Sequence, residues 1–138
     1  MSEPFAHSLR VRYHECDAQG IVFNANWLTY CDVALTELWR EAFGSYAALV
    51  AQGVDMVVAD ATLRFRRPGR FDDQLDLAVA VVAIEDTEVR LRTRARRGEE
   101  LLMEATLRYV AVDPATLTRT PLPASVRAGL ERYSDLGS

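Results

Sequence analysis

The feature that most constrains the fold is the change of hydrophobic period between one long segment of the chain and the next. From Asn26 to about Phe43, apolar side chains recur every three or four residues, which predicts one helix with a wide apolar stripe. From Val54 to Val112 they alternate every second residue, which predicts β-strands. A long apolar helix and a sheet with one apolar face bury each other when the sheet curls around the helix. We therefore expect an α+β fold, with an antiparallel five-stranded sheet wrapped around a long central helix.

Turn residues divide the remaining chain into short elements. The predicted order is a strand at 5–13, the helix at 26–43, a helical turn at 46–50, strands at 57–66, 75–84, 89–96 and 101–112, and a final helix at 125–133. Short turns between the last four strands favour a meander. Without repeats or a linker, residues 1–138 are expected to form one domain. Open sheet edges and a strand at 75–84 that is apolar on both faces predict self-association.

Composition excludes several classes of function. The chain has 138 residues, 49% of them hydrophobic, and a net charge of -4, which does not favour binding to nucleic acid. No apolar run approaches the ~18 residues of a membrane span, and the first residues lack the apolar core of a secretory signal. Cys16 and Cys31 form no CxxC pair, and His7 and His14 belong to no ligand cluster. We expect a cytoplasmic protein with no membrane span and no metal.

The loop before the helix, YHECDAQGIVFNANWL, gathers groups that suit hydrolysis of an ester or thioester. The carboxylate of Asp17 can attack an acyl carbon or take a proton from water. Free N–H groups at the helix N-terminus near Asn24 can stabilise the oxyanion. Gly20 allows a sharp turn close to a substrate. Three apolar side chains can line a pocket: Ile21, Val22 and Phe23.

Each of these residues also has a purely structural interpretation. The Asp-x-x-Gly sequence from Asp17 is common in turns, and Asn24 or Asn26 can be an ordinary helix cap. Glu15 is expected to form a salt bridge or hydrogen bond at the end of the first strand. Cys31 lies on the apolar stripe and is expected in the core rather than as a nucleophile.

Two stretches resemble a known family. The pattern Tyr13-x-Glu15-x-Asp17-x-x-Gly20-Ile21-Val22-Phe23-x-x-Asn26-Trp27-Leu28 resembles the hotdog-fold thioesterases, in particular the branch of the 4-hydroxybenzoyl-CoA and Tol–Pal-associated acyl-CoA thioesterases. Residues 63–73, LRFRRPGRFDD, are similar to the second strand of that family and its following turn. The resemblance implies a hotdog fold, a homodimer or homotetramer with active sites at the dimer interface, and an acyl-CoA or acyl-carrier thioester as substrate.

The resemblance also implies residue roles. Asp17 matches the catalytic carboxylate, and the backbone N–H of Asn24 matches the donor that polarises the carbonyl group. Substrate contacts are expected from the rest of the loop and the first helical turn: Gly20, Ile21, Val22, Phe23, Asn26 and Trp27. Tol–Pal-associated members commonly carry a histidine where Asn24 stands, so the mechanism expected here uses Asp17 and the backbone, without an imidazole.

The CoA moiety is expected to meet arginines. The basic turn that contacts CoA phosphates in the 4-hydroxybenzoyl relative is replaced here by residues 84–87, IEDT. Guanidinium groups near the earlier turn suit phosphate binding instead: Arg66, Arg67 and Arg70. CoA would be a product, so no cofactor is expected. A hydratase, which uses the same fold, is disfavoured because no histidine follows Asp17. The non-enzymatic alternative is an acyl-CoA-binding sensor that keeps the pocket without turnover.

Overall fold

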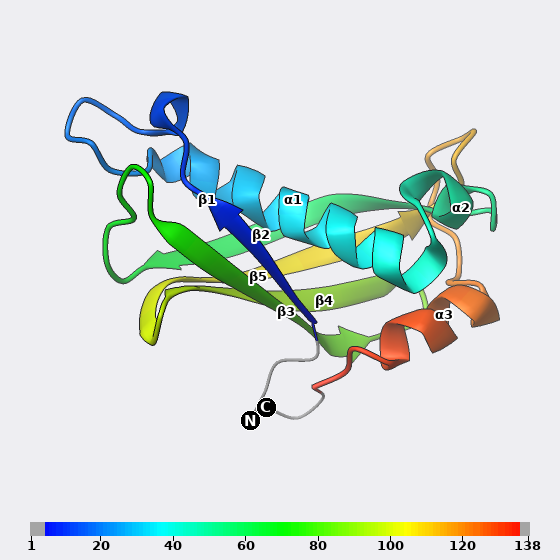
Figure 1. Ribbon diagram of the computed structural model, residues 1–138. Helices are drawn as coiled ribbons and strands as arrows, with labels where there is room; N and C mark the ends of the chain where they lie inside the picture. Colours follow the sequence, from blue (N-terminus) through cyan, green and yellow to red (C-terminus); the bar gives the residue numbers. More distant parts are fainter. Residues whose placement is uncertain (1–4, 136–138) are drawn as a thin grey trace.

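The computed structural model describes residues 5–135. In chain order its elements are β1 (Phe5–Arg10), a 3-10 turn (Tyr13–Glu15), α1 (Asn24–Phe43), α2 (Tyr46–Val50), β2 (Asp55–Phe65), β3 (Gln74–Ile84), β4 (Glu88–Arg97), β5 (Glu100–Val112) and α3 (Ala124–Glu131). The strands form one antiparallel sheet in the order β1-β3-β4-β5-β2. Figure 1 shows α1 lying along the concave face of this sheet. The expected α+β class and the sheet around a central helix are confirmed.

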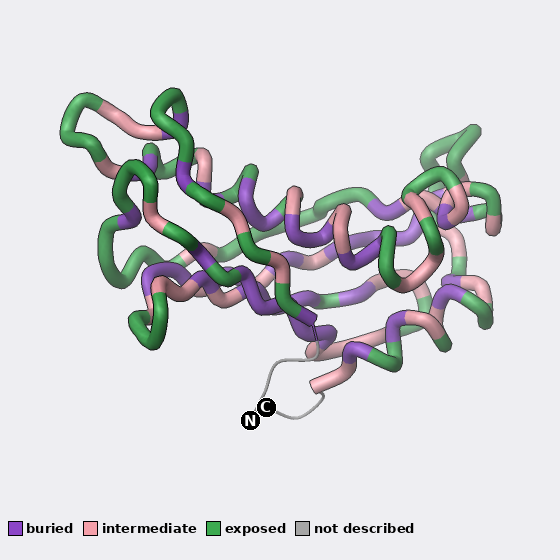
Figure 2. Tube along the Cα trace, in the orientation of Figure 1, coloured by how far each residue is buried: buried purple, intermediate pink, exposed green. Residues whose placement is uncertain are grey.

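The core lies between α1 and the inner face of the sheet. The helix buries one stripe of side chains: Trp27, Tyr30, Cys31, Ala34, Leu35, Leu38 and Trp39. The sheet contributes alternating residues of its central strands, among them Leu75, Leu77, Val79, Leu91, Ala105 and Leu107. In Figure 2 the buried segments accordingly follow the middle of the sheet and the facing side of α1. Cys31 is 2% exposed, so its predicted place in the core is confirmed.

The predicted meander of the last four strands is wrong, because β2 pairs with β5 and not with β3. Only β3, β4 and β5 follow one another by short hairpin turns. The connection at 66–73 is longer than a hairpin loop and carries the chain from one edge of the sheet to the strand beside β1. This order follows from the helix: α1 leaves β1 and crosses the sheet, so that the chain continues at the opposite edge.

Element boundaries also differ from the sequence prediction, by one or two residues at the later strands and elsewhere as follows. The first strand ends at Arg10 rather than at Tyr13, because residues 13–15 turn into a 3-10 helix. The long helix begins at Asn24 rather than at Asn26, since Phe23 is already its extended N-cap residue (φ -64°, ψ 138°). The last helix spans Ala124–Glu131 instead of 125–133.

The β2 edge leaves apolar residues uncovered. A register shift between Val58 and Asp60 breaks the simple alternation, so Val58 rather than Val57 faces the helix side, opposite Tyr109. Val58 is 47% exposed and Phe65, on the same face, is 54% exposed. On the neighbouring side of α1, Leu28 is 41% exposed. One edge of the sheet and the adjacent helix face thus present an unfilled apolar surface.

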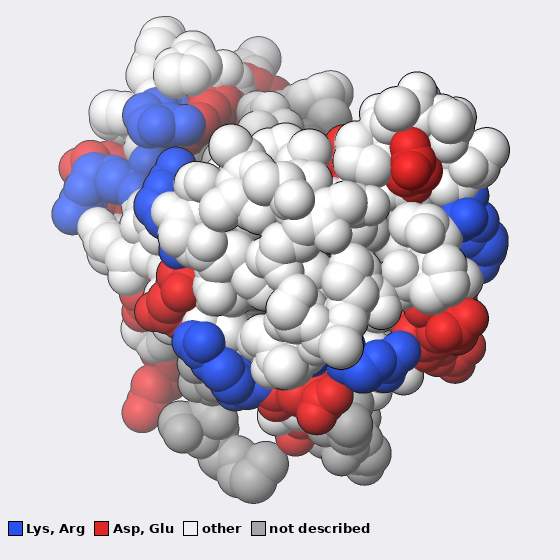
Figure 3. All heavy atoms as spheres, turned by 90° about the vertical axis from the view of Figure 1, so that its right-hand side faces the viewer, with Lys and Arg blue, Asp and Glu red and all other residues white. Residues whose placement is uncertain are grey.

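The end of the molecule that carries α2 and α3 has a different character. Its central surface is mostly uncharged, with charged side chains around the margin (Figure 3).

Within residues 5–135, no helix is both long and apolar enough to cross a membrane.

Candidate active site

The loop between β1 and α1 is a small hairpin with Asp17 at its start. The N–H of Asp17 donates to Ile21 O (2.8 Å), and Cys16 and Val22 form an antiparallel bridge. Gly20 closes the turn with φ +79°, a conformation that favours glycine. The sharp turn expected from Gly20 is therefore present.

The carboxylate of Asp17 caps its own turn. Its Oδ1 accepts hydrogen bonds from the N–H groups of Gln19 (2.8 Å) and Ile21 (3.4 Å). Among residues 5–135, Oδ2 accepts no hydrogen bond and faces no cation within ion-pair distance. One oxygen is thus fixed by the backbone while the other remains available to a substrate or a water molecule.

Glu15 connects this hairpin to α1. Its side chain is buried at 6% exposure and accepts hydrogen bonds from Arg12 N (2.8 Å), Arg12 Nε (2.9 Å), Arg12 Nη2 and the Tyr30 hydroxyl (2.8 Å). Burial alone raises the pKa of Glu15, but the hydrogen bonds from Arg12 and Tyr30 outweigh it and leave that pKa below its ordinary value. Glu15 is therefore an ionised buried carboxylate, and the expected salt bridge at this position is confirmed.

The first turn of α1 presents free backbone donors. Within residues 5–135, the N–H groups of Asn24 and Ala25 have no acceptor, whereas the N–H of Asn26 donates to Phe23 O (2.8 Å). The side-chain amide of Asn26 donates to Glu15 O (2.8 Å). The helix N-terminus at Asn24 can thus stabilise a negative charge, and Asn26 fixes the helix to the preceding turn.

A cavity of about 240 Å³ opens beside this helix terminus. Its wall combines residues of the loop and α1 with the end of β2 and the following turn: Ile21, Val22, Asn24, Trp27, Phe65, Arg66, Arg67 and Pro68. The turn is attached to the loop, since Val22 N donates to Gly69 O (2.8 Å). One pocket therefore holds a helix N-terminus, apolar walls and two arginines.

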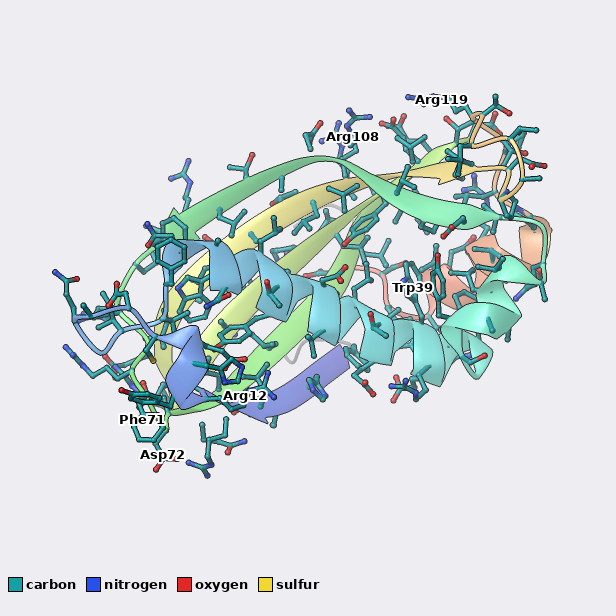
Figure 4. The ribbon with its side chains drawn as sticks, turned by 90° about the horizontal axis from the view of Figure 1, so that it is seen from above. Arg12, Trp39, Phe71, Asp72, Arg108 and Arg119 are labelled. Atoms are coloured by element: carbon teal, nitrogen blue, oxygen red, sulfur yellow. The ribbon has the colours of Figure 1, made fainter. Side chains whose placement is uncertain are left out.

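Asp17 lines a second cavity, of about 490 Å³, on the same loop. Tyr13 and Phe71 are exposed there and meet edge to face, with ring centroids 5.9 Å apart. Figure 4 shows Phe71 and Arg12 at the end of the molecule where α1 begins. Cys16 also lines this cavity, but burial, with the neighbouring carboxylate of Asp17, raises the pKa of its thiol and disfavours the thiolate.

The three predicted phosphate ligands differ in their surroundings. Arg66 lies 3.3 Å from Glu104, and Arg67 lies 3.7 Å from Glu100. Both line the 240 Å³ cavity. Arg70 lies outside it and forms a backbone bridge with Ile21. The ion pairs of Arg66 and Arg67 are exposed and weak, so these guanidinium groups can exchange a carboxylate for a phosphate.

The structure brings only part of the predicted site into one pocket. Ile21, Val22, Asn24, Trp27, Arg66 and Arg67 line it together, whereas Asp17 and Gly20 line the neighbouring cavity. Phe23 is 52% exposed and lines neither cavity. Phe65 and Pro68 are pocket residues that the sequence prediction missed. The sequence prediction also missed the hydrogen bond from Tyr30 to Glu15, although a buried tyrosine hydroxyl ordinarily requires a partner.

Comparison with known proteins agrees with this fold. The sequence model of the thioesterase superfamily matches residues 19–104. The acyl-CoA thioester hydrolase YbgC of Escherichia coli O6:H1 is 33% identical over 125 residues, which cover 90% of this chain and 93% of the relative. A 1,4-dihydroxy-2-naphthoyl-CoA hydrolase of Acaryochloris marina is 28% identical over 138 residues, with coverage of 90% and 93%.

A solved structure extends the comparison to the fold. The 1,4-dihydroxy-2-naphthoyl-CoA thioesterase Slr0204 from Synechocystis superposes with a TM-score of 0.82 at 18% identity, covering 91% of this chain and 94% of that one. The expected thioester hydrolase class is confirmed at the level of the family. The chain belongs to the thioesterase superfamily and has the hotdog fold.

Proposed function

We propose that this protein hydrolyses acyl-CoA thioesters, with Asp17 as nucleophile or general base and the helix N-terminus at Asn24 as the site that polarises the carbonyl group. The observation that carries the proposal is the 240 Å³ cavity, which joins free N–H groups of α1 to an apolar wall and to Arg66 and Arg67. The names of the relatives, an acyl-CoA thioester hydrolase and a 1,4-dihydroxy-2-naphthoyl-CoA hydrolase, support the same substrate class.

Two routes use the same groups. As a nucleophile, Oδ2 of Asp17 bonds to the acyl carbon, the C–S bond breaks, CoA leaves as a thiolate, and water hydrolyses the resulting anhydride. As a general base, Asp17 takes a proton from water, whose oxygen bonds to the acyl carbon before the thiolate leaves. In both routes negative charge grows on the carbonyl oxygen, where the N–H of Asn24 and the helix dipole stabilise it.

The remaining loop residues serve binding in this proposal. Ile21, Val22 and Trp27 line the apolar part of the site. Arg66 and Arg67 at its rim meet the phosphates of CoA, because planar guanidinium groups bind phosphate through two hydrogen bonds. Gly20 keeps the turn short between Asp17 and the pocket wall.

We also infer that the active form is a homodimer or a homotetramer. β2 is an edge strand of 11 residues whose free backbone groups are available for pairing. Next to it, Leu28 and Val58 border a cavity of about 330 Å³ between α1 and the sheet. A second copy placed against this edge would cover both the backbone and the apolar groove.

The test is hydrolysis of a panel of aliphatic and aromatic acyl-CoAs by the wild type, by Asp17→Asn and by a matched control, Asp72→Asn. Asp72 is an exposed carboxylate at the same end of the molecule (Figure 4). Asp17→Asn should lower kcat by at least ~100-fold, because the amide is neither nucleophile nor base. Asp72→Asn should retain wild-type kcat. Equal rates for wild type and Asp17→Asn would refute the role of Asp17. Binding of acyl-CoA without turnover by the wild type would instead support a sensor.

A further inference from the structure

A hydrogen-bonded cluster, here called the Glu15 clamp, lies next to the proposed site. Its members are Arg12, Glu15, Asn26 and Tyr30. It contains an ionised carboxylate at 6% exposure. A buried charge of this kind is costly unless an opposite charge and hydrogen bonds compensate it. Arg12 compensates the charge, but its own side chain is 62% exposed. In the clamp, a buried carboxylate is therefore paired with an arginine at the protein surface.

The clamp joins the two segments that must act together. Glu15 lies two residues before Asp17 in the chain, and its carbonyl oxygen accepts hydrogen bonds from Phe23 N (3.0 Å) and Asn26 Nδ2 (2.8 Å). Phe23 is the N-cap residue of α1 and directly precedes Asn24. The backbone of Glu15 therefore contacts the start of the helix that carries the proposed oxyanion donor.

The side chain of Glu15 adds a second connection one turn further along α1. Its Oε1 accepts from the Tyr30 hydroxyl at 2.8 Å, and the Tyr30 ring packs edge to face on Trp27, with centroids 5.5 Å apart. Trp27 lines the 240 Å³ cavity. The carboxylate thus holds the first two turns of α1 and one pocket wall in register with the Asp17 hairpin.

We propose that Glu15 and Tyr30 are positioning residues for thioester hydrolysis, which fix Asp17 relative to the N-terminus of α1. This inference rests on the proposed function, since it assigns the clamp to the same reaction. Neither residue contacts the substrate. Each acts because a small displacement between Asp17 and the donor of Asn24 lowers the rate of the chemical step without weakening binding.

The test compares two tyrosines that make the same kind of contact. Tyr133, at the end of α3, is also buried, donates to Glu41 Oε2 at 2.8 Å, and packs edge to face on Phe5. Tyr30→Phe and Tyr133→Phe therefore each remove a hydrogen bond to a glutamate, at different ends of the molecule, and Tyr133→Phe also removes the 3.1 Å hydrogen bond that the Tyr133 hydroxyl accepts from Arg132 Nη2. Tyr30→Phe should lower kcat about tenfold with KM changed less than about twofold, whereas Tyr133→Phe should keep both constants.

Glu15→Gln provides a second variant. The amide keeps the length of the side chain but removes the ion pair with Arg12, so its kcat should fall further than that of Tyr30→Phe, again with KM preserved. All rates are measured well below the melting temperature of the least stable variant, so that every sample is folded. If Tyr30→Phe keeps wild-type kcat, or if Tyr133→Phe loses as much, the positioning role is refuted.

The same series separates this inference from the proposed function. If Asp17→Asn abolishes activity but Tyr30→Phe does not change it, only the positioning role of the clamp is refuted. Wild-type activity in Asp17→Asn refutes the catalytic role of Asp17, and with it the reason for positioning Asp17, whereas absence of turnover by the wild type refutes the proposed function.

Discussion

Gly69→Ala should destabilise the protein and disturb the pocket, because the position has no room for a methyl group. A Cβ at Gly69 would lie 3.0 Å from Trp27 Cζ2 and 3.1 Å from Val22 Cγ2, closer than the ~3.5–4.0 Å of a favourable carbon contact. Trp27 is 3% exposed and backed by the Tyr30 ring, so it has little room to retreat. Overpacking of this kind costs about 1–3 kcal/mol.

The expected shift in melting temperature follows from chain length. An unfolding entropy of about 2.1 cal/mol/K per residue gives roughly 0.3 kcal/mol/K for 138 residues, so Tm should fall by about 3–10 °C. Thermal melting by circular dichroism measures this shift. KM for acyl-CoA should rise in the same variant, since Trp27 and Val22 line the cavity.

Gly129→Ala in α3 is the control. Its Cβ would meet the Phe43 ring, 2.5 Å from Cε1, far from the proposed site. It should lower Tm and leave KM unchanged. The reasoning is wrong if Gly69→Ala melts within about 1 °C of the wild type, because Trp27 and Val22 would then yield freely.

Four further changes test other parts of the structure. Val58→Lys at the β2 edge should convert the proposed oligomer to a monomer in sedimentation analysis, whereas Leu117→Lys, at another exposed apolar residue that lies in a loop, should not. Glu15→Gln should lower the free energy of unfolding most near neutral pH, and the difference from the wild type should shrink as pH falls below 4.5. The reason is that the lowered pKa of Glu15 stabilises the fold only while the carboxylate is ionised. Melting curves from acid to neutral pH check this. Arg67→Ala should raise KM for acyl-CoA several-fold, most at low salt, with kcat kept, as steady-state kinetics would show. Gly20→Ala should cost about 1–2 kcal/mol in guanidinium denaturation, because φ at Gly20 is +79°.

Local patterns sufficed for the elements but not for the order of the sheet. The helix stripe and the alternation in β3, β4 and β5 follow from side-chain period, and the short turns at 85–87 and 98–99 identify their hairpins. The strand that pairs with β2 depends on the sheet edge at which the chain arrives after α1. The residues of β2 do not indicate which edge this is. The only local signal was the length of the 66–73 connection, which exceeds that of a hairpin loop.

The same distinction applies to the site. Residues 13–28 lie close in sequence, so the turn at Gly20, the capped carboxylate of Asp17 and the helix N-terminus at Asn24 could be anticipated from that stretch. Phe65 and Pro68 could not, because they reach the pocket only through the sheet order. Phe23 was expected in the pocket from its place in an apolar run, but as the N-cap residue its side chain is exposed.

Because Asp17 and Asn24 line different cavities, the proposed reaction requires that the position of one relative to the other is fixed. The hairpin that carries Asp17 forms part of the walls of two cavities, and its only fixed carboxylate oxygen is Oδ1. In the proposed reaction, a thioester with its carbonyl oxygen at Asn24 would meet Oδ2 only while that hairpin keeps its position against α1. Backbone contacts at Val22 and Gly69 hold one side of it, and the Glu15 carbonyl holds the other. In the proposed reaction these anchors act in addition to the carboxylate, which is why the buried side chains of Glu15 and Tyr30, which do not contact the substrate, should affect kcat and not KM.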